Sequence, residues 1–164
     1  MITIKDLTVK NFMSVGNVTQ AVRFTDNGLT LVLGNNVDLG GDGSRNGTGK
    51  TTIINALSYA IYGNALTNIR KDNLINKTNG KAMLVTLDFV KDGTQYRIER
   101  GRRPNTLKYY VNEQNVDEDE AQGEDRQTQA QIEKLFGMSH DMFKHIVALN
   151  TYTEPFLSMR ANDQ

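Results

Sequence analysis

The chain has 164 residues, 19 basic and 19 acidic side chains, a formal net charge of zero, and no cysteine. This length can bury one sizeable core, and the lack of cysteine excludes disulfides, thiolate metal sites and cysteine nucleophiles, in agreement with a reducing cytoplasm. No stretch reaches the roughly 18 apolar residues of a membrane span, and the first residues lack a signal peptide's apolar block, so we expect a soluble cytoplasmic protein without a membrane partner.

The N-terminal segment alternates polar and apolar residues. Residues 3–12 and, more weakly, residues 18–24 have the two-residue period of strands, which predicts a β-meander. The turn residues 26–28 lead into the apolar run Leu-Thr-Leu-Val-Leu at residues 29–33. Such a run is typical of a central strand, so we expect residues 29–33 to form a buried strand.

A glycine-rich loop follows the predicted buried strand. Beyond it, residues 51–62 carry apolar side chains at helical spacing, and Gly63 is a typical helix stop. A strand, a glycine loop with Lys-Thr, and an amphipathic helix in this order are the context of a phosphate-binding loop. We place this loop at residues 44–52, with the candidate nucleotide-binding residues Asn46, Gly47, Thr48, Gly49, Lys50, Thr51 and Thr52.

Two residues of this loop have predicted chemical roles. The Lys50 ammonium is expected to reach the β- and γ-phosphates, and it is the candidate catalytic residue, while the Thr51 hydroxyl is expected to coordinate Mg²⁺. Ser44 departs from the glycine usual at the first loop position, and residues 34–43 are longer than a tight turn requires. The alternative is an ordinary surface turn, which also uses Gly and Asn.

The middle of the chain predicts a surface excursion followed by a hairpin. Residues 64–80 are polar and irregular. The strand patterns at residues 82–90 and 95–100 flank an Asp-Gly turn within residues 91–94, and residues 107–111 predict a third strand.

The C-terminal third predicts two helices. The first has one apolar face, formed by Ile132, Leu135 and Phe136, and is expected to end at Gly137. Ser139 can cap the second helix, which carries apolar residues up to position 149. The two histidines, His140 and His145, lie on the second helix without a partner at an obvious spacing, so we expect structural roles for both.

Charge is segregated along the chain despite its zero sum. Residues 97–108 carry five basic side chains and one acidic one, whereas residues 113–125 carry seven acidic side chains and no basic one. The basic stretch could meet a phosphate backbone, and the acidic stretch is typical of a solvated loop.

These motifs together resemble the SMC-like ABC ATPases of the double-strand-break repair nuclease complexes, the SbcC type. The resemblance implies an α/β fold, the N-terminal lobe of an ABC-type ATPase head. It places an antiparallel meander and hairpin beside a central strand, loop and helix. Residues 1–164 would form this lobe, with a coiled coil and a C-terminal lobe after residue 164. The resemblance is carried by residues 7–14, 28–29, 46–52, 85–89, 96–100 and 143–157.

The resemblance also implies an activity and partners. Such subunits bind ATP with Mg²⁺, and two heads form a homodimer around two nucleotides, which gates a metal-dependent nuclease subunit on double-stranded DNA. The catalytic glutamate, signature serine and switch histidine of the family belong to the other lobe. Lys50 alone would therefore bind ATP without hydrolysing it efficiently.

The family motifs assign further residues. Asn150 stands where the family has a Mg²⁺-coordinating glutamine and is one methylene shorter; a helix cap is the alternative. Met13 occupies a position close to the nucleotide where the family often has a basic residue. Ser14 is then a minor candidate for that role, and an ordinary serine at the end of a strand is the alternative. The family holds DNA in a basic groove. The basic residues that could line such a groove here could instead be ordinary solvated surface charges. The candidate DNA contacts on or beside the hairpin are Arg100, Arg102, Arg103 and Lys108, and the polar excursion offers Lys71, Lys77 and Lys81 as further candidates.

Two other functions remain open at this point. One is an ATP-responsive clamp or scaffold in which the nucleotide joins two heads without turnover. The other is a self-contained P-loop NTPase of another class, such as a small GTPase or a nucleotide kinase. Against the latter stand the absent Asn-Lys-x-Asp motif and the late position of the phosphate loop.

Overall fold

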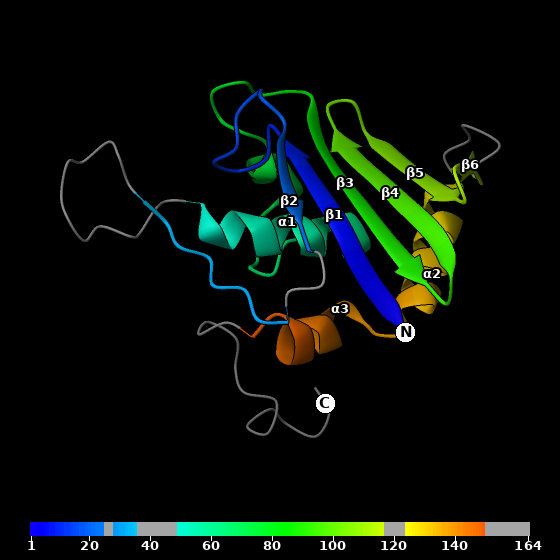
Figure 1. The fold of residues 1–164 in the computed structure, drawn as a ribbon. Coiled ribbons are helices and arrows are strands. Elements are labelled where there is room, and N and C mark those ends of the chain that lie inside the picture. The colour runs from blue at the N-terminus through cyan, green and yellow to red at the C-terminus, as the bar shows by residue number, and fades with distance from the viewer. Residues whose placement is uncertain (25–27, 36–48, 117–123, 150–164) are drawn as a thin grey trace, which may run out of the picture.

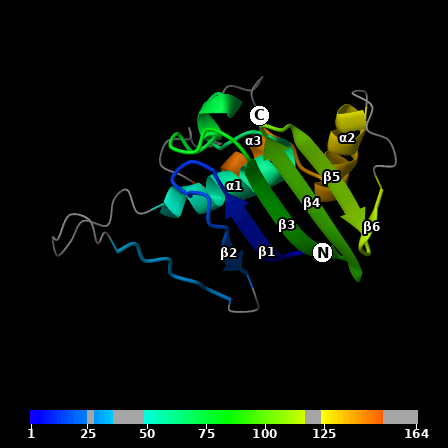
Figure 2. The ribbon, with the colours of Figure 1, turned by 90° about the horizontal axis from the view of Figure 1, so that it is seen from above.

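A six-stranded antiparallel sheet is covered on one face by helices (Figures 1 and 2). The computed structural model describes residues 1–24, 28–35, 49–116 and 124–149. The strand order is β2-β1-β3-β4-β5-β6. The strands are β1 (Ile2–Lys10), β2 (Gln20–Arg23), β3 (Met83–Lys91), β4 (Thr94–Arg102), β5 (Thr106–Val111) and β6 (Gln114–Asn115).

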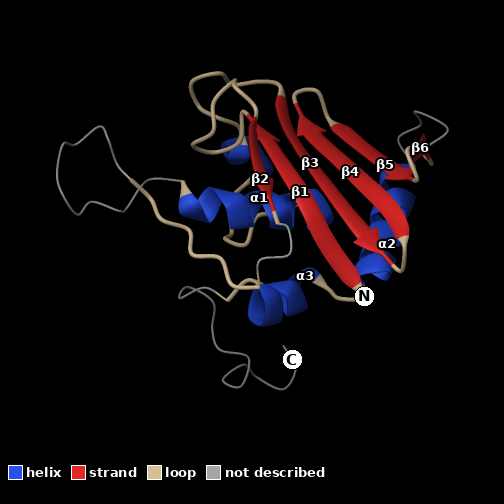
Figure 3. Ribbon diagram, viewed as in Figure 1, coloured by secondary structure: helices blue, strands red, loops and turns tan. Residues whose placement is uncertain are grey.

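The helices come from two parts of the chain (Figure 3). Helix α1 spans Lys50–Tyr62, and α2 spans Glu124–Phe136. A 3-10 turn, η1, lies at Lys71–Leu74, and α3 (His140–Met142) continues into the π-helical turn η2 (Phe143–Val147). In the described ranges, no helix is long and apolar enough to cross a membrane.

The predicted strands of the meander and hairpin are confirmed. The meander corresponds to β1 and β2, and the hairpin to β3 and β4, which β5 extends. Asp92 and Gly93 connect β3 to β4, with φ of 50° and 84°. Positive φ at both central residues is the geometry of a type I′ turn, which matches the right-handed twist of paired strands.

The predicted buried strand at residues 29–33 is wrong for this structure. These residues are assigned to no strand, and Leu29 and Leu31 are 95% and 80% exposed. A strand needs a neighbour for its backbone groups, and in the described part of the chain this segment pairs with no other strand. Apolar content alone therefore did not determine burial here.

The core lies between the inner face of the sheet and α1. Leu87 on β3 and Ile98 on β4 are fully buried and are direct cross-strand partners. They belong to the same buried cluster as Ala60 and Ile61 of α1. The outer face carries alternating charges instead, such as the exposed pair between Arg97 and Asp88. This one-sided burial explains the alternating pattern of the strands.

The helix ends agree with the predicted stops. Gly63 and Gly137 have φ of 69° and 68°, the left-handed conformation that favours glycine after a helix. Ser139 caps α3 by accepting a hydrogen bond from the Met142 N–H. The last predicted helix is shorter than expected, because its helical turns end at Val147. Within it Phe143 is buried, whereas Ile146 is 58% exposed.

The polar segment 64–80 is more than a surface excursion. Leu74 and Ile75 are buried in the core, and Ile75 forms a β-bridge with Phe12. The buried side chain of Asn11 accepts a hydrogen bond from Asn79 (2.8 Å). The segment that leads to β3 is therefore bound to the end of β1 by these contacts.

Arg100 stabilises the C-terminal end of α1. Its guanidinium donates to the carbonyls of Ala60 (3.0 Å) and Ile61 (3.4 Å) and to the side-chain oxygen of Gln129 (2.6 Å) on α2. The last carbonyls of a helix lack partners within the helix and carry partial negative charge. Arg100 thus joins β4, α1 and α2.

We expect Arg100→Ala to lower the free energy of unfolding by about 2–4 kcal/mol, because several hydrogen bonds to a charged donor are lost together. Arg97→Ala removes only the exposed ion pair on the outer face and should cost less than about 1 kcal/mol. Urea denaturation of both variants measures the difference. Equal losses would contradict the role assigned to Arg100.

Candidate nucleotide site

Helix α1 begins at the predicted phosphate loop. Gly49 precedes its first residue with φ 85° and ψ 7°, a left-handed conformation, and the Thr52 N–H donates to the Gly49 carbonyl (3.0 Å). The N-terminus of a helix presents backbone N–H groups and partial positive charge, which favour a phosphate. The predicted loop residues Asn46, Gly47 and Thr48 lie outside the described residues, as does Asn150.

The three residues after Gly49 face different surroundings. Lys50 is half-buried and Thr51 is exposed, so a ligand at the helix N-terminus can reach both. Thr52 is only 5% exposed, and its hydroxyl lies 2.9 Å from the hydroxyl of Ser14. The contacts of Lys50 and Thr51 to phosphate and Mg²⁺ stay predictions, whereas Thr52 is held by the protein.

A cavity of about 400 Å³ lies beside this helix start. Its apolar lining is Val9, Val15, Val22 and Ile53, and its polar lining includes Ser14, Gln20 and Thr52. Apolar walls with a few polar groups are typical of small-molecule sites, and this volume lies in their usual range of roughly 300–1,000 Å³. The walls come from β1, β2, the start of α1 and the turn after β1, where the resemblance placed Met13 and Ser14 as residues near the nucleotide.

The candidate DNA contacts do not form one cluster. Arg100 and Arg102 lie on the inner face of the sheet, because they pair across the strands with the buried residues Val85 and Met83. Lys108 is the cross-strand partner of Glu99 on the outer face. The predicted grouping is therefore wrong, since neighbouring residues of a strand point to opposite faces.

Arg100 is also unsuited to a direct DNA contact, because the protein itself occupies its guanidinium. Burial lowers its pKa to about 10. Arg102 is free of that constraint and donates to the Asp72 carboxylate (2.7 Å), while Arg103 lies 3.9 Å from the same carboxylate. Of the four candidate DNA contacts, Arg102 and Arg103 are thus the two that lie together at one exposed end of the sheet.

A second cavity, of about 370 Å³, opens beside Arg102. Lys71, Arg100 and Arg126 also line it, together with Asp125. Burial lowers the pKa of Lys71, and the neighbouring charges of Arg100 and Arg102 lower it further. The sequence offered Lys71 as a further candidate DNA contact, whereas Arg126, which follows the acidic stretch, was not predicted.

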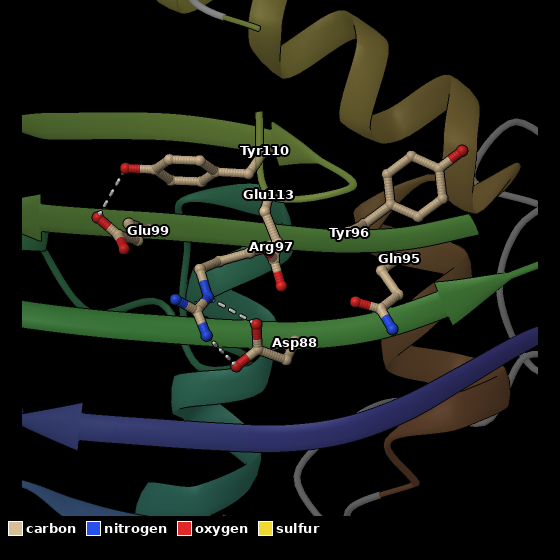
Figure 4. A pocket seen from close by; sticks show the side chains of 7 residues that line it. All are labelled: Asp88, Gln95, Tyr96, Arg97, Glu99, Tyr110 and Glu113. Carbon is tan, nitrogen blue, oxygen red and sulfur yellow. Dashed lines mark hydrogen bonds and ion pairs between the residues drawn. The ribbon is translucent and has the colours of Figure 1, made fainter. Parts of the chain in front are cut away.

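The outer face carries a third cavity, of about 350 Å³, in which Arg97 is paired with Asp88 and Tyr110 with Glu99 (Figure 4). The Arg97 guanidinium donates twice to the Asp88 carboxylate, at 2.7 and 3.2 Å, and the Tyr110 hydroxyl donates to Glu99 at 3.5 Å. Tyr109, on the other face, is buried and stacks on Tyr96. Tyr109 therefore belongs to the core, whereas Tyr110 lies on the outer face.

His140 has the structural role predicted for it, with a partner that sequence spacing could not reveal. Its Nε2 lies 2.9 Å from the hydroxyl of Ser58 on α1, and its ring lies 5.0 Å from that of Tyr62. The Ser58 hydroxyl donates to the Asn64 carbonyl, so it accepts from the imidazole N–H. Burial, and then the charge of Lys144, lower the pKa of His140. Within the described ranges, no group of three His, Cys, Asp or Glu residues could hold a metal ion.

A family model described as an AAA domain matches residues 6–163, nearly the whole chain. The chain belongs to this family. Its AAA domain is similar to exonuclease subunit 2 of Enterobacteria phage T4, with 36% identity over 152 residues, and of Escherichia phage RB69, with 33% identity over 152 residues. Each alignment covers 92% of the chain and 25% of the relative, so the chain spans about a quarter of the length of these phage proteins.

An archaeal protein and two solved structures extend the comparison. The DNA double-strand break repair Rad50 ATPase of Archaeoglobus fulgidus is 33% identical over 100 residues, which cover 61% of the chain and 10% of that protein. A structure from a study of ATP-driven dimerization and DNA-stimulated activation of SMC ATPases matches with a TM-score of 0.62 at 20% identity, covering 98% of this chain and 93% of that one. The Smc head domain of Pyrococcus furiosus with an extended coiled coil, bound to the C-terminal domain of ScpA, matches with a TM-score of 0.51 at 18% identity, over 86% of this chain and 35% of that one.

These findings confirm the predicted resemblance to SMC-like ATPases of the SbcC type and the predicted α/β fold of an N-terminal head lobe. The two structures show the fold alone, because their identities to the AAA domain are low. The site residues stay predictions, supported by the geometry at the start of α1.

The lowered pKa of His140 predicts a stability that depends on pH. Folding favours the neutral imidazole, so its contribution is present above the unfolded pKa of about 6.5 and is lost as the pH falls through the folded pKa. We expect the wild-type protein to lose more free energy of unfolding between pH 7 and pH 5 than His140→Asn, which does not titrate there. Urea denaturation at both pH values measures the two losses, and identical losses would contradict the prediction.

Proposed function

We propose that the chain is the nucleotide-binding lobe of an ATP-hydrolysing subunit in a DNA repair and recombination nuclease complex. The observation that carries this proposal is the start of α1, where Gly49 is left-handed, Lys50 and Thr51 are accessible, and a cavity of small-molecule size is lined by Gly49 and Thr52. The names of the relatives, two exonuclease subunits and a Rad50 ATPase, support the same assignment.

The proposed chemistry is phosphoryl transfer from ATP to water. Lys50 would hold the β- and γ-phosphates, Thr51 would hold Mg²⁺ on its exposed hydroxyl, and Asn150 would complete the metal coordination. Mg²⁺, when bound, would neutralise charge that develops on the phosphates. Hydrolysis would further require a C-terminal lobe, reached through a coiled coil after residue 164, and a second head.

The exposed apolar residues fit such a second lobe. Leu29, Leu31 and Leu33 are at least 67% exposed, and Leu149 is 80% exposed. Apolar side chains gathered along exposed segments mark surfaces that other protein covers. In this proposal, residues 29–33 become a strand only when the remaining part of the head supplies their neighbours. Two complete heads would then close on two ATP molecules and gate a metal-dependent nuclease subunit.

We expect Lys50→Ala to weaken ATP binding about a hundredfold or more, because it removes a charge-assisted contact to two phosphates. Thr51→Ala should keep nucleotide binding but lose most of the gain in affinity that Mg²⁺ provides. Titration of a fluorescent ATP analogue with and without Mg²⁺ measures both effects. Lys108→Ala, on the outer sheet face, is the matched lysine control. An unchanged affinity in Lys50→Ala would refute the phosphate assignment.

The partner DNA is proposed to meet the end of the sheet that carries Arg102 and Arg103. Reversing both to Glu should weaken binding of double-stranded DNA mainly at low salt, where attraction to phosphates is least screened. Lys108→Glu reverses a charge on the opposite face and should have little effect. Binding measured over a range of salt concentrations separates the variants. An unaltered salt profile of the double variant would assign Arg102 and Arg103 to solvated surface.

A further inference from the structure

The turn that follows β1 is held in an unusual backbone shape. Asn11 and Met13 have φ of 51° and 50°, values that cost energy for residues other than glycine. The Asn11 N–H donates to the Gly16 carbonyl (2.8 Å), and the Met13 N–H donates to the Leu74 carbonyl (2.7 Å). The surrounding fold therefore imposes the shape of this turn.

Asparagine side chains fasten the same turn to the segment before β3. Asn76 donates to the Met13 carbonyl (3.0 Å), and Asn79 donates to Asn11, which in turn donates to the Ala82 carbonyl (3.3 Å). The side chain of Asn11 is almost fully buried. A buried amide is costly unless its hydrogen bonds are made, so this arrangement specifies one position of the turn.

At the tip of the turn, Ser14 meets the start of α1 at two points. Its Oγ lies 2.9 Å from the Thr52 Oγ1 and 3.2 Å from the place that a Cβ on Gly49 would occupy. Successive residues of a helix point about 100° apart around its axis. Fixing Thr52 against Ser14 therefore sets the directions in which Lys50 and Thr51 leave the helix.

We propose that Ser14 is a positioning residue of the nucleotide site. Its hydrogen bond to Thr52 holds the first turn of α1 so that Lys50 and Thr51 face the phosphates and Mg²⁺. This inference rests on the proposed function, because it requires phosphates at the N-terminus of α1. Ser14 acts through Thr52, and the asparagine contacts of the turn act through Ser14.

The test is a double-mutant cycle on nucleotide affinity. The dissociation constant of a fluorescent ATP analogue is measured with and without Mg²⁺ for the wild type, Ser14→Ala, Thr52→Ala and the double variant. Loss of one hydrogen bond should raise the constant for Mg²⁺-ATP about three- to tenfold in each single variant. If Ser14 acts through Thr52, the double variant binds no more weakly than the weaker single variant. Ser14→Thr keeps the hydroxyl and should retain most of the affinity.

Controls separate positioning from general stability. Ser14 is exposed, so Ser14→Ala should leave the midpoint of thermal unfolding nearly unchanged, whereas its affinity gain from Mg²⁺ should shrink. Thr8→Ala removes a hydroxyl from the outer face of β1, the strand before the turn, and should bind like the wild type. Wild-type affinity and Mg²⁺ response in Ser14→Ala, or additive losses in the cycle, would overturn the positioning role.

Lys50→Ala in the same assay separates a failure of the Ser14 role from a failure of the phosphate site itself. Loss of binding in Lys50→Ala with wild-type behaviour of Ser14→Ala would overturn the role of Ser14 and keep the phosphate site. Wild-type binding in Lys50→Ala would overturn the phosphate site and the role of Ser14 with it.

Discussion

The rest of the described structure depends on the position of helix α1, whose two ends carry opposite partial charges. The aligned peptide groups leave partial positive charge at the N-terminus and partial negative charge at the C-terminus. Arg100 satisfies the carbonyls of Ala60 and Ile61 at the C-terminus. At Gly49, no side chain of the described residues caps the N-terminus, so its N–H groups are suited to an anionic ligand. The helix can present this end to a phosphate because the sheet and Arg100 hold the remainder.

Local features were predictable from the sequence because few neighbouring residues determine them. The turn at Asp92 and Gly93 needs positive φ twice, and glycine with aspartate is a common solution. Gly63 ends α1 for the same reason, and Ser139 caps α3 with its own hydroxyl. The phosphate loop stays a prediction, and its described residues from Gly49 onward lie at the start of a helix, as the Gly-Lys-Thr pattern predicts.

The burial of apolar segments and the grouping of basic side chains were less predictable, because both depend on residues distant in sequence. Residues 29–33 are as apolar as a core strand, yet they lie exposed without a neighbouring strand among the described residues. Arg100 and Lys108 belong to one basic stretch, but the register of β4 and β5 directs them to opposite faces. One of them binds helix carbonyls and the other faces solvent. A count of charges along the chain cannot separate these roles, since the face of a residue is fixed only once its strand is paired.

The candidate nucleotide site is therefore built from segments whose importance a local motif does not show. The polar segment 64–80 has no apolar pattern of a helix or strand, yet its residues Leu74, Asn76 and Asn79 hold the turn that carries Ser14. A hydrophobic contact alone would tolerate small shifts of that turn, whereas hydrogen bonds between amides and carbonyls require particular distances and angles. Polar contacts are thus used where orientation matters most, between the end of β1 and the first turn of α1. The apolar contacts between sheet and helix supply the stability that makes such orientation possible.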